Sequence, residues 1–306
     1  MFDILVAGEI NPDLILSGDV TPEFGQVEKL VDSAWLSIGS SSAIFACAAA
    51  RLGLEVAFIG VCGDDVFGHF MLEQMQARHV DISNVIIVPG GQTGLSIILN
   101  RGDDRAILTH SGLIGSLRAD HVTENILLQA RHLHVASYFL QSALQPDLPS
   151  LFSRARAAGL TTSLDTNWDP SGAWRGFDDL LRLVDVFLPN QNEALAISAA
   201  STLEDALHVL AQKCPLVAIK CGKDGAYAAQ GSDTTYAPAL VVQVVDAIGA
   251  GDNFDAGFLY GWLNGWKLER SLQLAAACGS LSTRSAGGVS AQPTLQEAMS
   301  YVQSPG

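Results

Sequence analysis

One short segment, residues 246–254 (DAIGAGDNF), combines small residues with carboxylates just before a predicted helix. Apolar residues at Phe254, Phe258 and Trp262 recur every four positions, which is the spacing of a helix face. Glycines at a helix N-terminus let backbone N–H groups approach an anion closely, and the helix dipole adds positive potential there. Asp252 then lies in the first turn, beside that anion site. Either it accepts the proton of a hydroxyl that attacks a phosphate, or it is an ordinary helix cap.

This segment resembles the C-terminal signature of the ribokinase-like, or PfkB-type, carbohydrate kinases, which reads Asp-x-x-Gly-Ala-Gly-Asp-x-Phe. The resemblance implies an enzyme that transfers the γ-phosphoryl group of ATP, bound with Mg²⁺, to a primary hydroxyl of a sugar. It also implies roles for single residues. Gly249, Ala250 and Gly251 would form an anion hole, and Asp252 would be the catalytic base.

Residues 8–13 (GEINPD) resemble the early sugar-binding segment of the same family. In that family an Asp of this segment accepts hydrogen bonds from substrate hydroxyls. The resemblance therefore makes Asn11 and Asp13 candidate substrate-binding residues. The simpler interpretation of Asp13 is a turn residue that follows Pro12.

Gly39 and Ser40 precede an alanine-rich predicted helix, which resembles the family's N-terminal signature of a Gly-Gly pair before such a helix. Both are candidate substrate-binding residues, although a serine here is also an ordinary N-cap. The match has two departures, because Ser40 replaces the second glycine and Ile44 replaces a sugar-contacting Asn. These departures leave the identity of the sugar open. Residues 60–68 (GVCGDDVFG) continue the resemblance as a structural element.

Two later segments resemble the nucleotide side of the family's site. Asn190 and Glu193 match an N-x-x-E motif, which would act on the Mg²⁺–ATP complex mainly through water. The alternative is a helix capping box, which uses the same spacing. Lys220, Gly222 and Gly225 match a nucleotide-contacting loop in which the lysine would reach the ATP phosphates. Here the alternative is a glycine-rich hairpin turn.

Further residues are candidates for binding cations. The resemblance implies that Asp246 and the carbonyl of Ile248 could hold a monovalent cation such as K⁺, near a late loop at residues 285–288. His132 and His134 occupy alternate positions of a predicted strand, with no third candidate ligand nearby in the sequence. We therefore interpret the two histidines as packing or solvent-facing groups rather than a metal pair.

The acceptor is expected to be uncharged. A kinase that selects an anionic acceptor needs cationic groups in its pocket, typically Arg with its bidentate fork. The segment 165–170 (DTNWDP) resembles a D-x-N element of sugar-acid and hexose kinases, but Asp169 stands where those often carry Arg. Arg101 and Arg105 are the exceptions that could contact substrate, although intervening acidic residues favour a solvated turn.

Two alternative functions remain at this stage. The first is a nucleoside kinase on the same scaffold, which would need apolar or aromatic side chains for base stacking, and Ile44 and Tyr138 leave that open. The second is a catalytically silent sugar-binding regulator. The intact segment around Asp252 argues against the silent protein.

Apolar runs that end at Gly, Asp or Asn alternate with helical patterns along the whole chain, which predicts a doubly wound, mostly parallel sheet with helices on both faces. We expect strands at 2–7, 56–61, 132–136, 161–164, 184–188 and 216–219, and helices at 43–52, 148–158, 202–213 and 253–263. Residues of about 11–38 and 85–110 break the pattern and predict a small β lid on a single domain spanning 1–306. An edge strand of such a lid could form a homodimer.

Composition excludes several partners. The chain has 306 residues and a net charge of −15, which argues against a nucleic-acid or anionic-membrane surface. The N-terminus lacks the basic region of a signal peptide, and no apolar run is long enough to span a membrane. Five cysteines in apolar contexts, without a C-x-x-C pair, predict buried free thiols and hence a cytoplasmic protein.

Overall fold

The computed structural model describes residues 1–101 and 104–302, and its largest element is a nine-stranded sheet. The strands are β1 (Ile4–Ala7), β4 (Val56–Ile59), β6 (Val80–Asp81), β10 (His132–Val135), β11 (Thr161–Leu164), β12 (Val186–Phe187), β13 (Leu216–Lys220), β14 (Ala226–Gln230) and β15 (Asp233–Ala237). Their order is β15-β14-β13-β12-β11-β10-β1-β4-β6. Pairs from β13 across to β6 are parallel, and β13–β14–β15 form antiparallel hairpins. The predicted α/β fold is confirmed.

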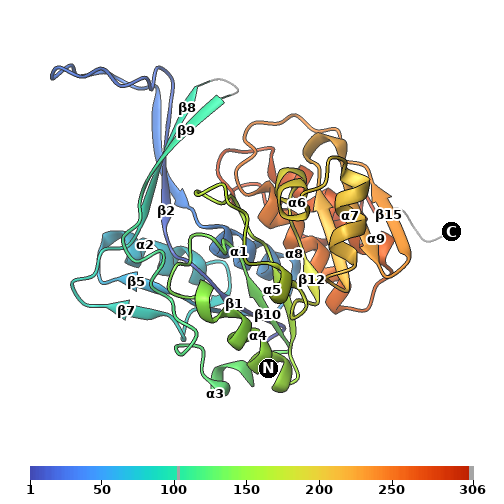
Figure 1. Cartoon of the computed structure of the whole chain (residues 1–306). Coiled ribbons are helices and arrows are strands. Elements are labelled where there is room, and N and C mark those ends of the chain that lie inside the picture. The colour runs from blue at the N-terminus through green and yellow to red at the C-terminus, as the bar shows by residue number, and fades with distance from the viewer. Residues whose placement is uncertain (102–103, 303–306) are drawn as a thin grey trace.

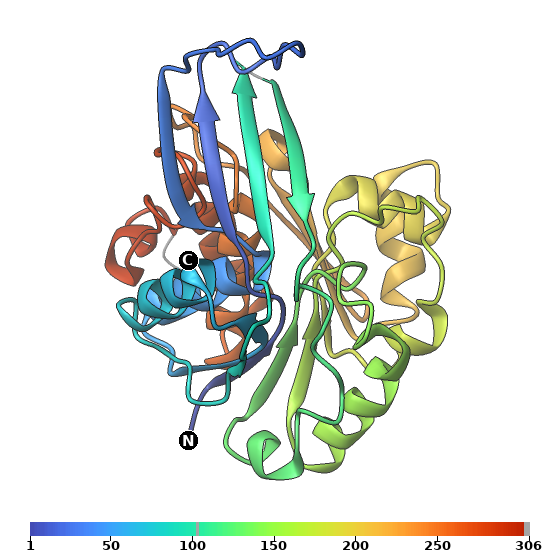
Figure 2. The same ribbon diagram turned by 90° about the vertical axis from the view of Figure 1, so that its left-hand side faces the viewer.

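Helices cover both faces of this sheet, because alternate residues of each buried strand point to opposite sides. In β1, Ile4 and Val6 belong to one apolar cluster, whereas Leu5 and Ala7 belong to the other. The first face carries α1 (Ser41–Leu52), α2 (Val66–Gln76), α8 (Ala250–Leu263), α9 (Leu268–Ser282) and α10 (Leu295–Met299). The second carries α3 (Glu124–Leu127), α4 (Leu148–Ala157), α5 (Asp178–Leu181), α6 (Gln191–Ser198) and α7 (Leu203–Ala211). Figure 1 and Figure 2 show the two layers.

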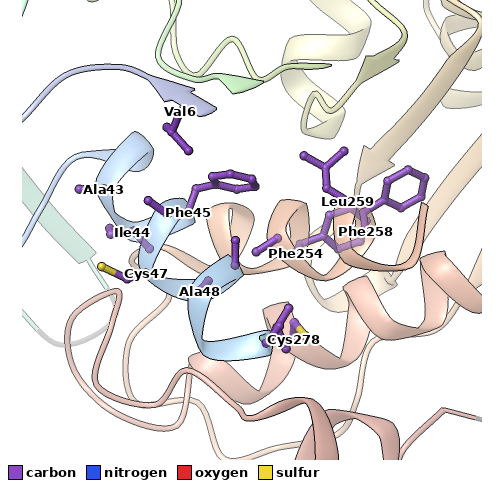
Figure 3. Close-up of a cluster of buried hydrophobic side chains, with 14 of the residues drawn as sticks. Val6, Ala43, Ile44, Phe45, Cys47, Ala48, Phe254, Phe258, Leu259 and Cys278 are labelled. Carbon is purple, nitrogen blue, oxygen red and sulfur yellow. The ribbon is translucent and has the colours of Figure 1, made fainter. Parts of the chain in front are cut away.

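Helices α1 and α8 pack against each other (Figure 3). Small residues such as Ala48 let the helices approach, and Phe45 and Phe258 fill the core without solvent exposure. Helix α1 begins at Ser41 and α8 at Ala250. This packing therefore fixes two helix N-termini, with their free N–H groups, on the same side of the sheet.

A second sheet projects from the body as a separate layer (Figure 1, Figure 2). Its strands are β2 (Pro12–Ser17), β3 (Ser33–Ile38), β8 (Leu95–Arg101) and β9 (Asp104–His110), in the order β3-β2-β8-β9. We call this four-stranded sheet the lid. It joins two segments that are far apart in the sequence, because β2 pairs in parallel with β8.

The structure differs from the expected lid at residues 86–88. These residues form β7 (Ile86–Val88), which pairs with β5 (Val61–Gly63) in a two-stranded sheet. The backbone N–H of Ile86 donates to the carbonyl of Gly60 at 2.9 Å, so this stretch follows the edge of the body before the chain enters the lid.

No single helix within residues 1–101 and 104–302 has the length and apolar character needed to cross a membrane. The bent pair α6 and α7 meets that criterion jointly, by length and composition.

Candidate active site

A cavity of about 800 Å³, with many polar side chains in its lining, lies between the lid and the carboxyl ends of the parallel strands. Ligands of open α/β sheets bind at this edge. Lid residues such as Ser96 and Thr109 form one wall. The cavity brings together most of the predicted site residues, namely Asn11, Asp13, Ser40, Asn190, Glu193, Lys220, Gly222, Ile248, Gly249, Ala250, Gly251 and Asp252. We call it the acceptor cavity.

The predicted anion hole forms the start of α8. Gly249 caps this helix with φ of 71°, a left-handed conformation that favours glycine. A Cβ at Gly249 would also lie 2.7 Å from the Cα of Gly288. Asn253 fixes both loops, because its Nδ2 donates to the carbonyl of Gly249 at 2.7 Å and to that of Gly288 at 3.0 Å. The N–H groups of the first turn are thus held toward the cavity.

Asp252 lines the acceptor cavity and is 8% exposed. Burial raises the pKa of this carboxyl well above its usual range, and the carboxylate of Asp165 acts in the same direction. The ammonium of Lys220 opposes that shift. A buried carboxylate with a raised pKa is a stronger base than an exposed one, which suits proton abstraction from a hydroxyl.

Lys220 is held by two carboxylates. Its Nζ lies 3.0 Å from an oxygen of Asp165 and 3.0 Å from one of Asp255. A Cβ on Gly251 would lie 3.5 Å from the same nitrogen, so the positive charge sits directly beside the anion hole. The sequence did not identify Asp255 as part of this group. Its position one helical turn after Asp252 was the available signal.

The acceptor side contains a buried carboxylate, Asp13, which is 7% exposed. Burial raises its pKa to about 7, while Arg105 lowers that pKa and Asp246 raises it. Asn11 also lines the cavity, and its Nδ2 donates to Ser96 Oγ at 3.4 Å. These oxygens and amides are suited to the hydroxyls of a polyol.

Gly39 does not line the acceptor cavity but determines where Asp13 lies. A Cβ on Gly39 would approach the Oδ1 of Asp13 to 2.2 Å, so a larger residue would displace that carboxylate. Ser40 caps α1, since its Oγ accepts from the N–H of Ala43 at 3.1 Å. The capping alternative for Ser40 is therefore present in the structure.

A hydrogen-bonded network in the wall of the acceptor cavity was not predicted from the sequence. Glu9, 2% exposed, accepts from Ser42 Oγ at 2.6 Å and from Ser137 Oγ at 2.8 Å. Asn167 Nδ2 donates to Ser41 Oγ at 2.8 Å. Glu9 stands two positions before Asn11, within a segment already assigned to sugar binding, and this proximity was the available signal.

Asn190 and Glu193 form a helix capping box, which was one of the two interpretations that the sequence allowed. Asn190 Oδ1 accepts from the N–H of Glu193 at 3.0 Å, and a Glu193 oxygen accepts from the N–H of Asn190 at 2.9 Å. Burial raises the pKa of Glu193 to about 7, the Asp165 carboxylate adds to this shift, and Lys220 opposes it. Both residues line the acceptor cavity. Their oxygens are already used in the cap, which fits a contact to Mg²⁺ through water better than direct ligation.

The described residues contain no cluster of three or more His, Cys, Asp or Glu side chains that could hold a metal ion.

Asp246, a predicted ligand of a monovalent cation, accepts from the N–H groups of Ile248 and Gly287, each at 3.0 Å. The Nη1 of Arg105 lies 3.8 Å from its Oδ1 and supplies a positive charge from the lid. Arg101 lies outside the acceptor cavity, and its Nη1 contacts Thr21 at 3.4 Å.

A second, mostly apolar cavity of about 430 Å³ adjoins the first. It is lined by Ala239, Leu240, Val242, Val244, Phe254, Ala276 and neighbouring residues, with Gly225 at one edge. Lys220, Gly222, Ala247, Ala250 and Gly251 line both cavities. We call it the apolar cavity. Of the residues that line the apolar cavity, the sequence had predicted Lys220, Gly222, Gly225, Ala250 and Gly251 as site residues.

Three other polar residues have structural contacts. Asp169 accepts from the N–H groups of Ser171 at 2.8 Å and Trp174 at 2.7 Å, which closes a turn, and it does not line either cavity. His132 and His134 are buried in β10, and both contact Ser163 Oγ at 2.7 Å.

Comparison with known proteins agrees with this geometry. The family described as pfkB family carbohydrate kinase matches residues 1–295. An ATP-dependent ribose-1-phosphate kinase from Halopiger xanaduensis is 32% identical over 99% of this chain and 98% of its own. The structure of a candidate ribokinase II from E. coli is 26% identical with a TM-score of 0.88, covering 98% of this chain and 99% of its own. A second structure of that protein, with a TM-score of 0.86, is a complex with ATP and Mg²⁺. The chain therefore belongs to the pfkB family of carbohydrate kinases.

Proposed function

We propose that this kinase transfers the γ-phosphoryl group of ATP to a primary hydroxyl of an uncharged sugar. The observation that carries the proposal is the position of Asp252 and the start of α8 between a polar and an apolar cavity. The polar cavity suits a sugar, and the apolar cavity suits a nucleobase. The two cavities share lining residues at the start of α8, such as Ala250 and Gly251, where a phosphoryl group would be transferred from ATP to the sugar.

Asp252 accepts the proton of the acceptor hydroxyl as the oxygen attacks phosphorus. The N–H groups of Gly249 to Gly251 and the ammonium of Lys220 stabilise the charge that develops on the transferred group. Mg²⁺ bound with ATP would neutralise its phosphates, and Asn190 and Glu193 would hold that metal through water. The lid covers the acceptor and excludes water, which would otherwise compete as the phosphoryl acceptor.

The charges around the acceptor cavity support an uncharged sugar. Glu9, Asp13 and Asp252 contribute carboxyl groups to its lining. Arg105 adds a cation from the lid, but its guanidinium faces Asp246. An anionic acceptor would have to compete for that arginine with a carboxylate already in place.

A phosphorylated sugar is the second candidate acceptor, because Arg105 lines the acceptor cavity. The sequence had favoured a solvated turn for this arginine. The relative from Halopiger xanaduensis acts on ribose 1-phosphate by its description, which supports this candidate. If the acceptor is a phosphorylated sugar, Arg105 would leave Asp246 and bind the phosphate group of that acceptor.

The test is a coupled assay of ATP consumption over pentoses, hexoses, their phosphates and nucleosides. An uncharged sugar with the highest kcat/KM supports the proposal. A phosphorylated sugar preferred tenfold or more, with the preference lost in Arg105→Ala and kept in Arg101→Ala, would establish the second candidate. A nucleoside with the highest kcat/KM, or no ATP consumption with any acceptor, contradicts both.

Three finer features belong to the same proposal. A monovalent cation such as K⁺ at Asp246 and Ile248 stays a prediction. The guanidinium of Arg105 also places a positive charge beside Asp246. A homodimer through the lid is supported by β9, an edge strand whose residues are all exposed. Cytoplasmic location is supported by five free, buried cysteines.

A further inference from the structure

A third cavity, of about 420 Å³, lies on the α1 side of the sheet and plays no part in the proposed reaction. Its walls come from the end of α1, the residues after α2 and the loop before α10. They consist of Cys47, Arg51, Ala77, Arg78, His79, Val289, Ser290 and Gln292. This lining contains two arginines and a histidine and no acidic residue, in a chain whose net charge is −15.

The two guanidinium groups retain free donors. Arg51 uses its Nε to donate to the carbonyl of Gln292 at 3.4 Å. Arg78 uses its Nη1 to donate to the carbonyl of Gln74 at 3.0 Å and to the side-chain Oε1 of Gln74 at 2.8 Å. Within residues 1–101 and 104–302, no carboxylate forms an ion pair with either arginine. By contrast, Arg131 and Arg284 each pair with a carboxylate, at 2.9 and 2.7 Å.

Neutralising the ends of α1 and α2 is the simpler role for these arginines, because helix C-termini carry negative potential. The contact from Arg78 to Gln74 is of this kind. That role requires one nitrogen of each guanidinium and does not require a shared cavity. Two arginines that line one cavity offer the planar, bidentate donors that bind a phosphate group.

We propose that this cavity binds the phosphate group of a small metabolite, through Arg51 and Arg78 with His79 at its rim. The ligand is either inorganic phosphate or a sugar phosphate monoester.

The loop that lines this cavity also reaches the anion hole. Gln292, 6% exposed, donates through Nε2 to the carbonyl of Ile44 at 3.0 Å and accepts from Arg51. Four residues earlier, Gly288 lies against Ile44 and Gly249. A ligand that holds Arg51 and Gln292 thus acts on a loop that shapes the catalytic site, which makes a change in the KM for the acceptor the expected consequence.

The experiment measures phosphate binding by calorimetry with the nucleotide side filled by Mg²⁺ and a non-hydrolysable ATP analogue. Inorganic phosphate and a sugar phosphate are titrated separately at constant ionic strength, with chloride as the competing anion. The variants are Arg51→Gln/Arg78→Gln and a charge-matched control, Arg118→Gln/Arg182→Gln, whose arginines are 60% and 74% exposed and pair with Asp120 and Asp179.

We expect saturable binding that weakens at least tenfold in Arg51→Gln/Arg78→Gln and stays unchanged in the control. Equal affinity for both ligands would identify free phosphate as the source, and tighter binding of the ester would identify a sugar phosphate. Binding that is absent in the wild type, or that persists in Arg51→Gln/Arg78→Gln with an unchanged melting temperature, would overturn the proposal. Arg105→Ala provides a further check, because loss of phosphate binding in that variant would place the phosphate in the acceptor cavity.

Discussion

The acceptor cavity and the apolar cavity meet at the same helix N-terminus but are built in different ways. The acceptor cavity takes its polar side chains from the ends of buried strands, such as Asp165 after β11 and Asn190 after β12, and from the lid. The apolar cavity is lined mostly by residues of the irregular stretch 239–247 and by α9.

This difference separates two functions of the fold. Strand ends are held rigidly by the sheet, so they can place hydroxyl-binding groups within a few tenths of an ångström. A nucleobase presents a flat apolar face, for which an apolar surface of suitable width is enough. We therefore expect changes in the acceptor cavity to alter catalysis and acceptor affinity, and changes in the apolar cavity to alter ATP affinity alone.

The largest expected effect comes from Asp252→Asn, at the junction of the two cavities. Loss of a general base lowers kcat roughly 10²–10⁴-fold, because the hydroxyl must then attack without proton transfer to the enzyme. Both ligands should still bind, since the substitution preserves shape. Kcat is measured by single-turnover kinetics and binding by calorimetry. A variant that keeps more than a tenth of wild-type kcat, with chemistry rate-limiting, would contradict the role of Asp252, and Asp179→Asn, 95% exposed, serves as the control.

The second effect tests whether the apolar cavity holds the nucleotide. Val242→Glu introduces a charge into this lining, so the KM for ATP should rise about 10–100-fold, whereas the KM for the acceptor should change less than twofold. The control is Leu128→Glu, at an exposed site that lines neither cavity. Equal changes in both KM values would show that the two cavities are not independent.

The sequence allowed the acceptor side to be predicted better than the apolar side, for a physical reason. Asn11, Asp13 and Asp252 lie in segments that resemble motifs of the family, and the resemblance implied their roles. Val242 and Ala276 are apolar residues outside those segments, and only the three-dimensional arrangement shows that they line a cavity.

Three contacts of the candidate site could not be predicted from local sequence, although Asp255 and Glu9 each lie close in sequence to a predicted site residue. Asp255 pairs with Lys220, which lies 35 positions earlier. Arg105, in strand β9 of the lid, lies 3.8 Å from Asp246. Glu9 contacts Ser137, 128 positions away. Each contact depends on how distant segments meet, whereas the periodicity of a strand or helix depends on neighbouring residues. The β5–β7 pairing, which removed residues 86–88 from the expected lid, has the same origin.

A smaller effect concerns Mg²⁺ and lies on the nucleotide-facing rim of the acceptor cavity. Glu193→Ala should weaken the apparent affinity for Mg²⁺ about tenfold, because a carboxylate that acts through water tunes metal binding more than it performs chemistry. Activity at saturating Mg²⁺ should be largely restored. The measurement is a Mg²⁺ titration of kcat/KM for ATP. Thr202→Ala, which removes the side-chain cap of α7, is the control for loss of a helix cap alone. An unchanged titration would leave only the capping role.

The smallest expected effect is a pH dependence of acceptor binding that arises from Asp13. Its pKa is raised to about 7 by burial, so its ionised fraction increases about threefold between pH 6.5 and 7.5. The carboxylate accepts hydrogen bonds from sugar hydroxyls more strongly than the neutral acid does, so the Kd for the acceptor should fall about threefold over that interval. Calorimetry in the Asp252→Asn background isolates this effect from the catalytic base.

The free protein provides a check of opposite sign. A carboxyl whose pKa is raised in the folded state contributes stability that is complete below its unfolded pKa and is lost as the pH rises through about 7. Asp13→Asn should therefore flatten both profiles, making acceptor binding and the free energy of unfolding less dependent on pH near 7. Glu193 titrates in the same range, so a pH dependence of acceptor binding that survives in Asp13→Asn but disappears in Glu193→Gln would assign the effect to Glu193. In that case Glu193 would govern acceptor binding and Asp13 would not, although Asp13 lies within β2 rather than in the turn that the sequence also allowed.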